Sequence, residues 1–219
     1  MNSKIRGRIS VVLYILVCII AIPSIPVFAT FVQNFGSNYY GVCAYSNAAN
    51  TTNAGTCGIT ISNNGFTLFL SVNPVPSGNC TIQSDQVTVN TYDPTGFTLT
   101  LGDETTTTSL VNAIINTIPA TTGTTSSPLA LSDTWGYRVD SRSGFGPGPT
   151  SAETNAAPDG SILFAGIKAS NLTADTIAQT ASRNPSVATT VWYGVCIDTS
   201  LGLPAGPYSN TVIYTATSN

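Results

Sequence analysis

The segment Thr211-Val212-Ile213-Tyr214-Thr215-Ala216-Thr217 decides the fold class. Apolar Val212, Tyr214 and Ala216 occupy every second position, and threonine fills most of the positions between them. A period of two residues places these two sets on opposite faces of a β-strand. Because threonine combines high β propensity with a hydroxyl that water can solvate, the segment predicts a half-buried antiparallel strand.

The same kind of pattern recurs along the chain. In Gln86-Val87-Thr88-Val89-Asn90 the two valines share one face, and the turn sequence Asp93-Pro94-Thr95-Gly96 follows shortly after. The clearest strands are predicted at residues 66–72, 86–92, 97–101, 135–139, 162–167, 189–198 and 208–217. Short helices are allowed at 109–116 and 174–181. The sequence therefore predicts an all-β fold: one antiparallel Ig-like β-sandwich with long Thr/Ser/Gly/Pro loops, preceded by a signal-peptide helix.

Composition excludes several classes of function. The chain has 219 residues, of which 42% are hydrophobic and 8% are charged, against roughly a quarter charged in an average soluble domain. A formal net charge of -3 gives no basic surface for nucleic acid. The chain has no histidine, the side chain used most often for acid-base catalysis and a common zinc ligand. We therefore expect no enzyme, no cofactor and no metal site.

The N-terminus has the features of an export signal. Lys4, Arg6 and Arg8 precede an apolar run at residues 11–22, and Val27-Phe28-Ala29 fits the small-x-small rule for cleavage. We predict a signal peptide at residues 1–29, cleaved after its last residue. The alternative is an uncleaved membrane anchor, which the two prolines near the end of the run disfavour.

The domain boundaries follow from this reading. Residues 30–44 form an aromatic segment expected to be extended, and residues 45–219 form the sandwich. The expected location is secreted or on the extracellular cell surface, with membrane contact only through the signal segment before cleavage.

Four cysteines follow the predicted signal. An even number in an exported chain indicates two disulfides, for which three connectivities exist. We favour Cys43–Cys57, which would close the Asn/Thr/Gly loop between them, together with Cys80–Cys196.

Three aromatic residues are candidates for ligand contact. Trp135, Tyr137 and Trp192 could form a platform on which a sugar stacks. Alternation favours core packing instead, since Trp192 shares its face with Gly194 and Cys196, and a tryptophan beside a disulfide is typical of a sandwich core.

Four further segments carry a resemblance to a known group. They are Asp93-Pro94-Thr95-Gly96-Phe97-Thr98-Leu99-Thr100-Leu101, Asp133-Thr134-Trp135-Gly136-Tyr137, Val191-Trp192-Tyr193-Gly194-Val195 and Leu203-Pro204-Ala205-Gly206-Pro207-Tyr208. In this order, with the last strand, they resemble an uncharacterised group of exported Thr-rich β-sandwich proteins of the candidate phyla radiation, which are ultra-small, host-attached bacteria. The resemblance implies a β-sandwich at the cell surface. The cysteines and Pro207 depart from the group.

Two functions fit these observations. The first is a structural or adhesive surface protein, in which residues 31–40 pair with a neighbouring subunit by strand addition. The alternative is a secreted carbohydrate- or ligand-binding module that acts through its loops. The expected partners are other surface proteins or glycans, including copies of the chain itself.

Overall fold

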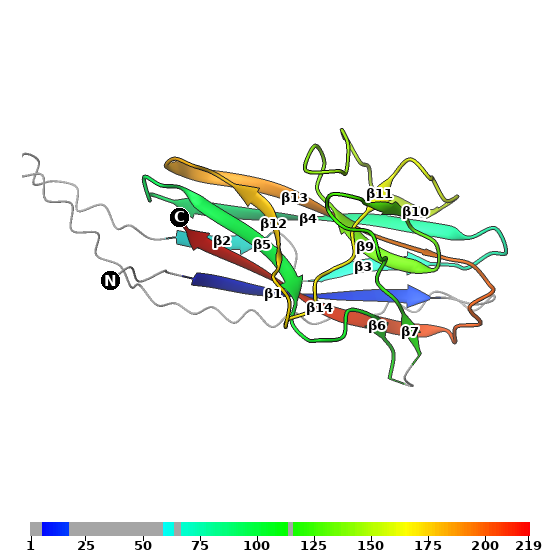
Figure 1. Ribbon diagram of the computed structural model, residues 1–219. Helices are drawn as coiled ribbons and strands as arrows, with labels where there is room; N and C mark the ends of the chain where they lie inside the picture. Colours follow the sequence, from blue (N-terminus) through cyan, green and yellow to red (C-terminus); the bar gives the residue numbers. More distant parts are fainter. Residues whose placement is uncertain (1–5, 18–58, 64–66, 114–115) are drawn as a thin grey trace, which may run out of the picture.

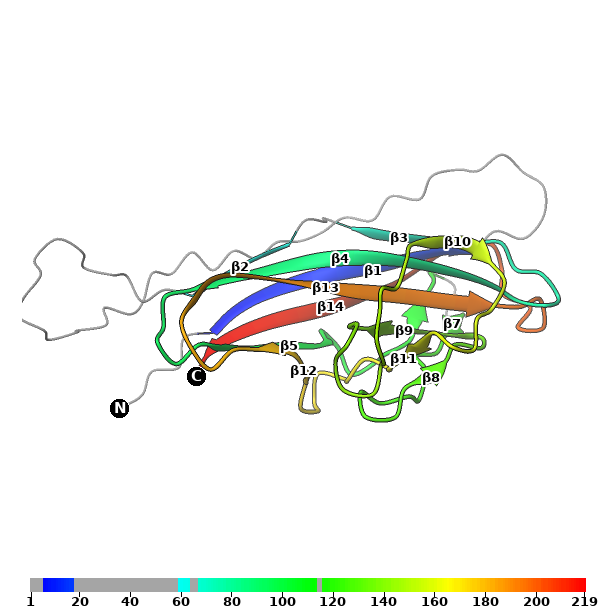
Figure 2. The ribbon, with the colours of Figure 1, turned by 90° about the horizontal axis from the view of Figure 1, so that it is seen from above.

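The computed structural model describes residues 6–17, 59–63, 67–113 and 116–219, and its elements in these ranges are all strands. Two sheets lie one above the other, with β4 and β13 over β1 and β14 (Figure 1). Seen from above, the long strands of both sheets run along the length of the molecule (Figure 2). The predicted all-β sandwich is confirmed.

The first sheet is built around the last strand of the chain. Its order is β12 (Asp175–Gln179), β5 (Phe97–Asp103), β14 (Gly206–Ser218), β1 (Arg6–Val17) and β3 (Leu68–Val72), with β6 (Leu110–Val111) pairing β14 and β7 (Thr117–Ile118). All pairings in it are antiparallel except that of β1 with β3.

The second sheet is antiparallel throughout. Its order is β10 (Glu153–Ala156), β4 (Asn79–Thr91), β13 (Asn184–Ile197) and β9 (Thr134–Arg138), and β2 (Ile59–Asn63) also pairs β4. A small pair, β8 (Leu129–Ala130) and β11 (Leu163–Phe164), lies beside this sheet.

The core lies between the two sheets and follows the alternation of the sequence. Every second position of β14 from Tyr208 to Ala216 is buried, and the positions between them are half-buried. From the facing sheet, Val87 and Val89 of β4 enter the same core. Each large apolar side chain buried in this way contributes roughly 1.5–3 kcal/mol to folding.

The turn between β4 and β5 explains one required glycine. The Asp93 carbonyl accepts a hydrogen bond from the Gly96 amide at 3.1 Å, and the Asp93 carboxylate accepts one from the Thr95 amide at 2.9 Å. Gly96 has φ of 81°, and a Cβ there would collide with the Thr180 carbonyl oxygen. The turn thus needs glycine both for its backbone angle and for space.

The helical expectations are corrected by the structure. Residues 109–116 include strand β6, and residues 174–181 include β12, which pairs β5. In β12 the alternation of Asp175-Thr176-Ile177 fits the edge of a sheet, and pairing with β5 outweighs a weak local preference for helix.

The expected signal-peptide helix is also a strand where the structure describes it. Residues Arg6–Val17 form β1, which pairs antiparallel with β14 and parallel with β3. The run is rich in Ile and Val, residues whose branched side chains favour strands whenever a sheet edge is available. Cleavage after Ala29 stays a prediction, since residues 18–58 lie outside the described ranges.

One predicted disulfide is confirmed. Cys80 of β4 and Cys196 of β13 are directly opposed in the ladder and are joined by a bond that closes 116 residues of sequence. The expected Cys43–Cys57 bond and the segment 30–44 lie outside the described residues.

Removal of the Cys80–Cys196 bond is expected to destabilise the protein by roughly 2–5 kcal/mol, because a cross-link over so long a loop restricts the unfolded chain. The measurement is denaturant unfolding of a Cys80→Ala/Cys196→Ala variant against the parent chain. A Cys43→Ser/Cys57→Ser variant, which would lose the other predicted bond over a much shorter loop, provides the comparison. Equal unfolding midpoints for parent and Cys80→Ala/Cys196→Ala would contradict the expectation.

Candidate functional site

The candidate aromatic residues lie mostly inside the protein. Trp135 and Tyr137 are both 0% exposed in the main core, as their shared face on β9 predicted. The Trp135 indole Nε1 donates to the Thr108 carbonyl at 2.9 Å, and the Tyr137 hydroxyl donates to Asp175 Oδ2 at 2.8 Å. These two residues therefore present no platform to a ligand, and core packing is their role.

Trp192 lies on the other face of the second sheet. It is half-buried against a separate cluster that includes Cys80, Cys196 and Phe164. Gly194, two positions along the same face, leaves room for Phe164, whose ring atoms would be 2.7 Å from an added Cβ. The disulfide thus has an apolar cover on the outer side of the sheet.

A buried pair of hydroxyls links the two sheets. Tyr193 of β13 and Tyr214 of β14 are both 0% exposed, and their hydroxyl oxygens are 2.7 Å apart. Burial raises the pKa of both phenols well above the usual value. The nearby Tyr193 and Asp85 raise the pKa of Tyr214 further. A polar contact inside the core specifies how the sheets face each other, since a misaligned sheet would leave hydroxyls unsatisfied.

A second polar cluster fastens a loop to β14. The buried Asn210 amide Nδ2 donates to Asp103 Oδ2 at 2.6 Å and to the Ser109 carbonyl at 3.3 Å. The Thr105 amide donates to Asp103 Oδ1 at 2.8 Å. Burial raises the pKa of Asp103 despite these hydrogen bonds. Because hydrogen-bond donors of the protein itself surround the Asp103 carboxylate, its role is structural.

The segment between β9 and β10 is held in a comparable way. Asp140 accepts hydrogen bonds from the Thr150 amide at 2.7 Å and the Thr150 hydroxyl at 2.7 Å, and it forms an ion pair with Arg138 at 2.8 Å. Burial alone would raise the pKa of Asp140, but these donors outweigh it and lower the pKa. The segment between β9 and β10 is therefore anchored at its base.

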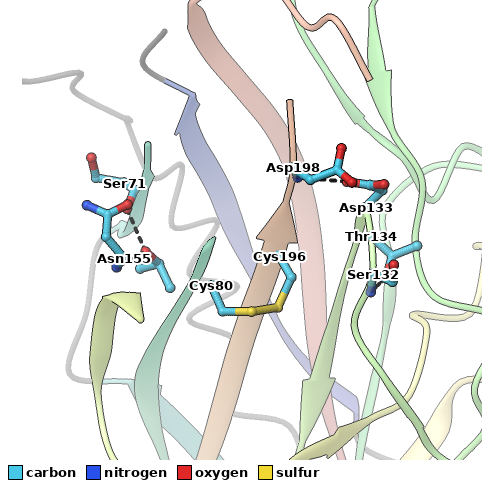
Figure 3. Close-up of a disulfide and its surroundings, with 9 residues drawn as sticks. Ser71, Cys80, Ser132, Asp133, Thr134, Asn155, Cys196 and Asp198 are labelled. Carbon is cyan, nitrogen blue, oxygen red and sulfur yellow. Dashed lines mark hydrogen bonds between the residues drawn. A yellow bond between two sulfur atoms is a disulfide. The ribbon is translucent and has the colours of Figure 1, made fainter. Parts of the chain in front are cut away.

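The disulfide end of the sandwich is also tied together by polar contacts (Figure 3). The Thr81 hydroxyl, next to Cys80, donates to the Ser71 carbonyl of β3 at 2.6 Å and accepts from the Asn155 amide at 3.2 Å. Near Cys196, the Asp198 amide donates to Asp133 Oδ1 at 2.9 Å. The two Thr81 bonds connect β3, β4 and β10, and the Asp198 bond joins the end of β13 to the start of β9.

None of these clusters has the form of a catalytic or metal centre. Within the described ranges, no group of three or more His, Cys, Asp and Glu residues could hold a metal ion. The hollow beside the disulfide, lined by Cys80, Ile82 and Phe164 among others, offers about 10 Å³. That is room for one water at most. The described residues also include no helix that is long and apolar enough to cross a membrane.

The feature that sequence reasoning missed is the place of Arg6–Val17 in the first sheet. The register runs from Arg6 opposite Thr217 to Val17 opposite Gly206, so β1 covers almost the whole of one edge of β14. The signal available in the sequence was the β-branched content of the run, which a signal peptide and a strand share.

Comparison with protein-family models, curated proteins and solved structures found no match. The resemblance to exported Thr-rich sandwich proteins therefore stays a prediction.

Raising the pH is expected to ionise Tyr137, Tyr193 and Tyr214 only when the chain unfolds. Folding raises the pKa of each phenol, chiefly by burial. The stability that depends on their protonation is therefore complete below the unfolded-state pKa of about 10 and is lost as the pH rises above it. Tyrosinate absorbance and circular dichroism should change together in this range.

The variant Tyr214→Phe is the control for this titration. It should reduce by one the number of phenols that ionise together with unfolding. Ionisation of all three phenols near pH 10 with an unchanged circular dichroism spectrum would contradict the assignment.

Proposed function

We propose that the protein is an exported structural or adhesive component of a cell surface, and not an enzyme. The observation that carries the proposal is the Cys80–Cys196 disulfide, which joins β4 and β13, two of the longest strands. Disulfides of this structural kind are typical of oxidising compartments outside the cytosol.

The polar interior supports the same proposal. Asp103, Asp140 and Asn210 accept or donate hydrogen bonds that fix loops to strands. A framework fastened at so many points suits a protein that bears load or keeps its shape at a surface. The predicted export signal and the low charge of the chain agree with it.

The alternative, a secreted ligand-binding module, is favoured less. Its sequence support was the aromatic set, and Trp135 and Tyr137 are fully buried in the core. The base of the segment between β9 and β10 is occupied by the Asp140 contacts described above.

Surface location can be tested with an epitope placed in the exposed turn after Asn171 of the full-length chain. Antibody labelling of intact cells, followed by fractionation, should find the epitope on the outside and with the cell envelope. An identical epitope after Leu163, within the short pair beside the second sheet, should disturb folding and serves as the negative control. Recovery of the correctly folded protein in the cytosol would refute the proposal.

A further inference from the structure

Strand β1 fills a slot between two strands of the first sheet. Its whole length, Arg6–Val17, pairs with β14, and its second half pairs with β3 from Leu13 opposite Leu68 to Val17 opposite Val72. Among the described strands, β3 has β1 as its sole partner in this sheet. The first sheet is continuous because β1 is present.

The same residues lie inside the segment predicted to leave the protein. Hydrolysis of the peptide bond after Ala29 during export would remove β1 with the rest of residues 1–29. One edge of β14 would then expose its backbone N–H and C=O groups, and β3 would be separated from the sheet. The core residues Tyr214 of β14 and Leu70 of β3, both 0% exposed with β1 present, flank the vacated slot. An open edge beside an open core is an acceptor for another strand.

We propose that β1 holds the place of a strand supplied by a second copy of the chain, namely residues 30–41 of the mature protein. This inference rests on the proposed export. The segment has the same number of residues as β1, twelve, which span about 40 Å in a strand. Phe31, Phe35 and Tyr39 would share one face of that strand, toward the core.

The charge of the segment also suits the slot. Residues 30–58 contain no Asp, Glu, Lys or Arg. The outward positions of β14 beside the slot include Thr211, Thr215 and Thr217, which are also uncharged. A neutral strand enters such an edge without an unpaired charge being desolvated.

The position of Ile59 indicates how the copies would be arranged. Ile59 pairs with Thr91, and the short turn after β4 leads to Phe97, which pairs with Ser218. Ile59 therefore lies at the end of the molecule where Arg6 pairs with Thr217, as the neighbouring β2 and C-terminus in Figure 1 show.

A donor strand in the orientation of β1 would leave the slot at the opposite end, beside Val17. It would then continue into its own domain at that domain's Ile59 end. Each copy thus fills the slot of the next, head to tail. Such a contact does not close on itself by a two-fold axis and extends into a filament.

The alternative occupant of the slot is residues 30–41 of the same chain. The short connection between this segment and Ile59 argues against it. To fill its own slot in this orientation, the chain must return from the Val17 end to Ile59, across about 40 Å. With the predicted Cys43–Cys57 bond formed, the path from residue 42 to Ile59 runs through the disulfide and shortens to a few residues. These cover less than half of that distance, at about 3.3 Å per residue.

The test uses the full-length gene with its own N-terminus in an exporting host. We expect the purified surface protein to begin at Thr30 and to form linear oligomers by electron microscopy and light scattering. The variant Phe31→Ser/Phe35→Ser/Tyr39→Ser should lose all oligomers. The control Asn34→Ser/Asn38→Ser, on the opposite face of the same segment, should keep them.

A second measurement holds even where the triple variant fails to fold. Wild-type oligomers dissociated by denaturant are refolded with excess synthetic peptide of residues 30–41, or with a scrambled peptide of the same composition. The native peptide should occupy the slots and give capped monomers, whereas chains refolded with the scrambled peptide should reassemble into oligomers through their own residues 30–41.

Two results would overturn the inference and leave the proposed function standing. One is surface protein whose N-terminus still includes Arg6–Val17, because β1 would then be permanent. The other is surface protein that begins at Thr30 and is a stable monomer, because a segment of the same chain would then fill its slot. An epitope missing from the surface would instead count against the proposed function.

Discussion

The pairing of β14 on both of its edges is the constraint on which the rest of the structure depends. One edge joins β5 and the other joins β1. Its buried face supplies core residues from Tyr208 to Ala216, and its Tyr214 hydroxyl meets Tyr193 of the opposite sheet. Its Asn210 fastens the loop after β5. A strand that carries the core, the contact between sheets and a loop anchor cannot lose an edge partner without consequences for all three.

The scarcity of charge has a structural counterpart. Several of the few charged side chains hold the fold together from inside the protein. Asp103 and Arg138 are buried, and Asp140 contacts both Arg138 and Thr150. Threonine takes their place on the outward positions of strands such as β14. A neutral surface is less costly to desolvate than a charged one and does not depend on salt-sensitive ion pairs, which suits contact between surfaces.

Much of the fold could be predicted from local patterns. Alternation located β4, β13 and β14, and it predicted burial of Trp135 and Tyr137 because residues two apart share a face. The pairing of Cys80 with Cys196 was favoured because Cys43 and Cys57 would close the loop between them, and the ladder register places Cys80 and Cys196 opposite each other.

The remainder depended on contacts that local patterns do not encode. The bond between Asn210 and Asp103 joins residues 107 apart in sequence, so no window could show it. The local sequence of β12 predicts a short helix, and only its pairing with β5 makes it a strand. An apolar run such as Arg6–Val17 satisfies both the rules for a signal and those for a strand. Its role is therefore decided by cleavage, which is a property of the cell and not of the pattern.

The most direct test of this account is hydrogen exchange in the exported protein, resolved to single amides of β14. In an antiparallel strand, alternate amides point to opposite edges, so one set in residues 206–218 bonds to β5 or β6 and the other to the occupant of the slot. The account predicts that both sets exchange slowly in protein that begins at Thr30. Fast exchange confined to the slot-facing set, with the β5-facing set protected, would show an empty slot and contradict the central claim.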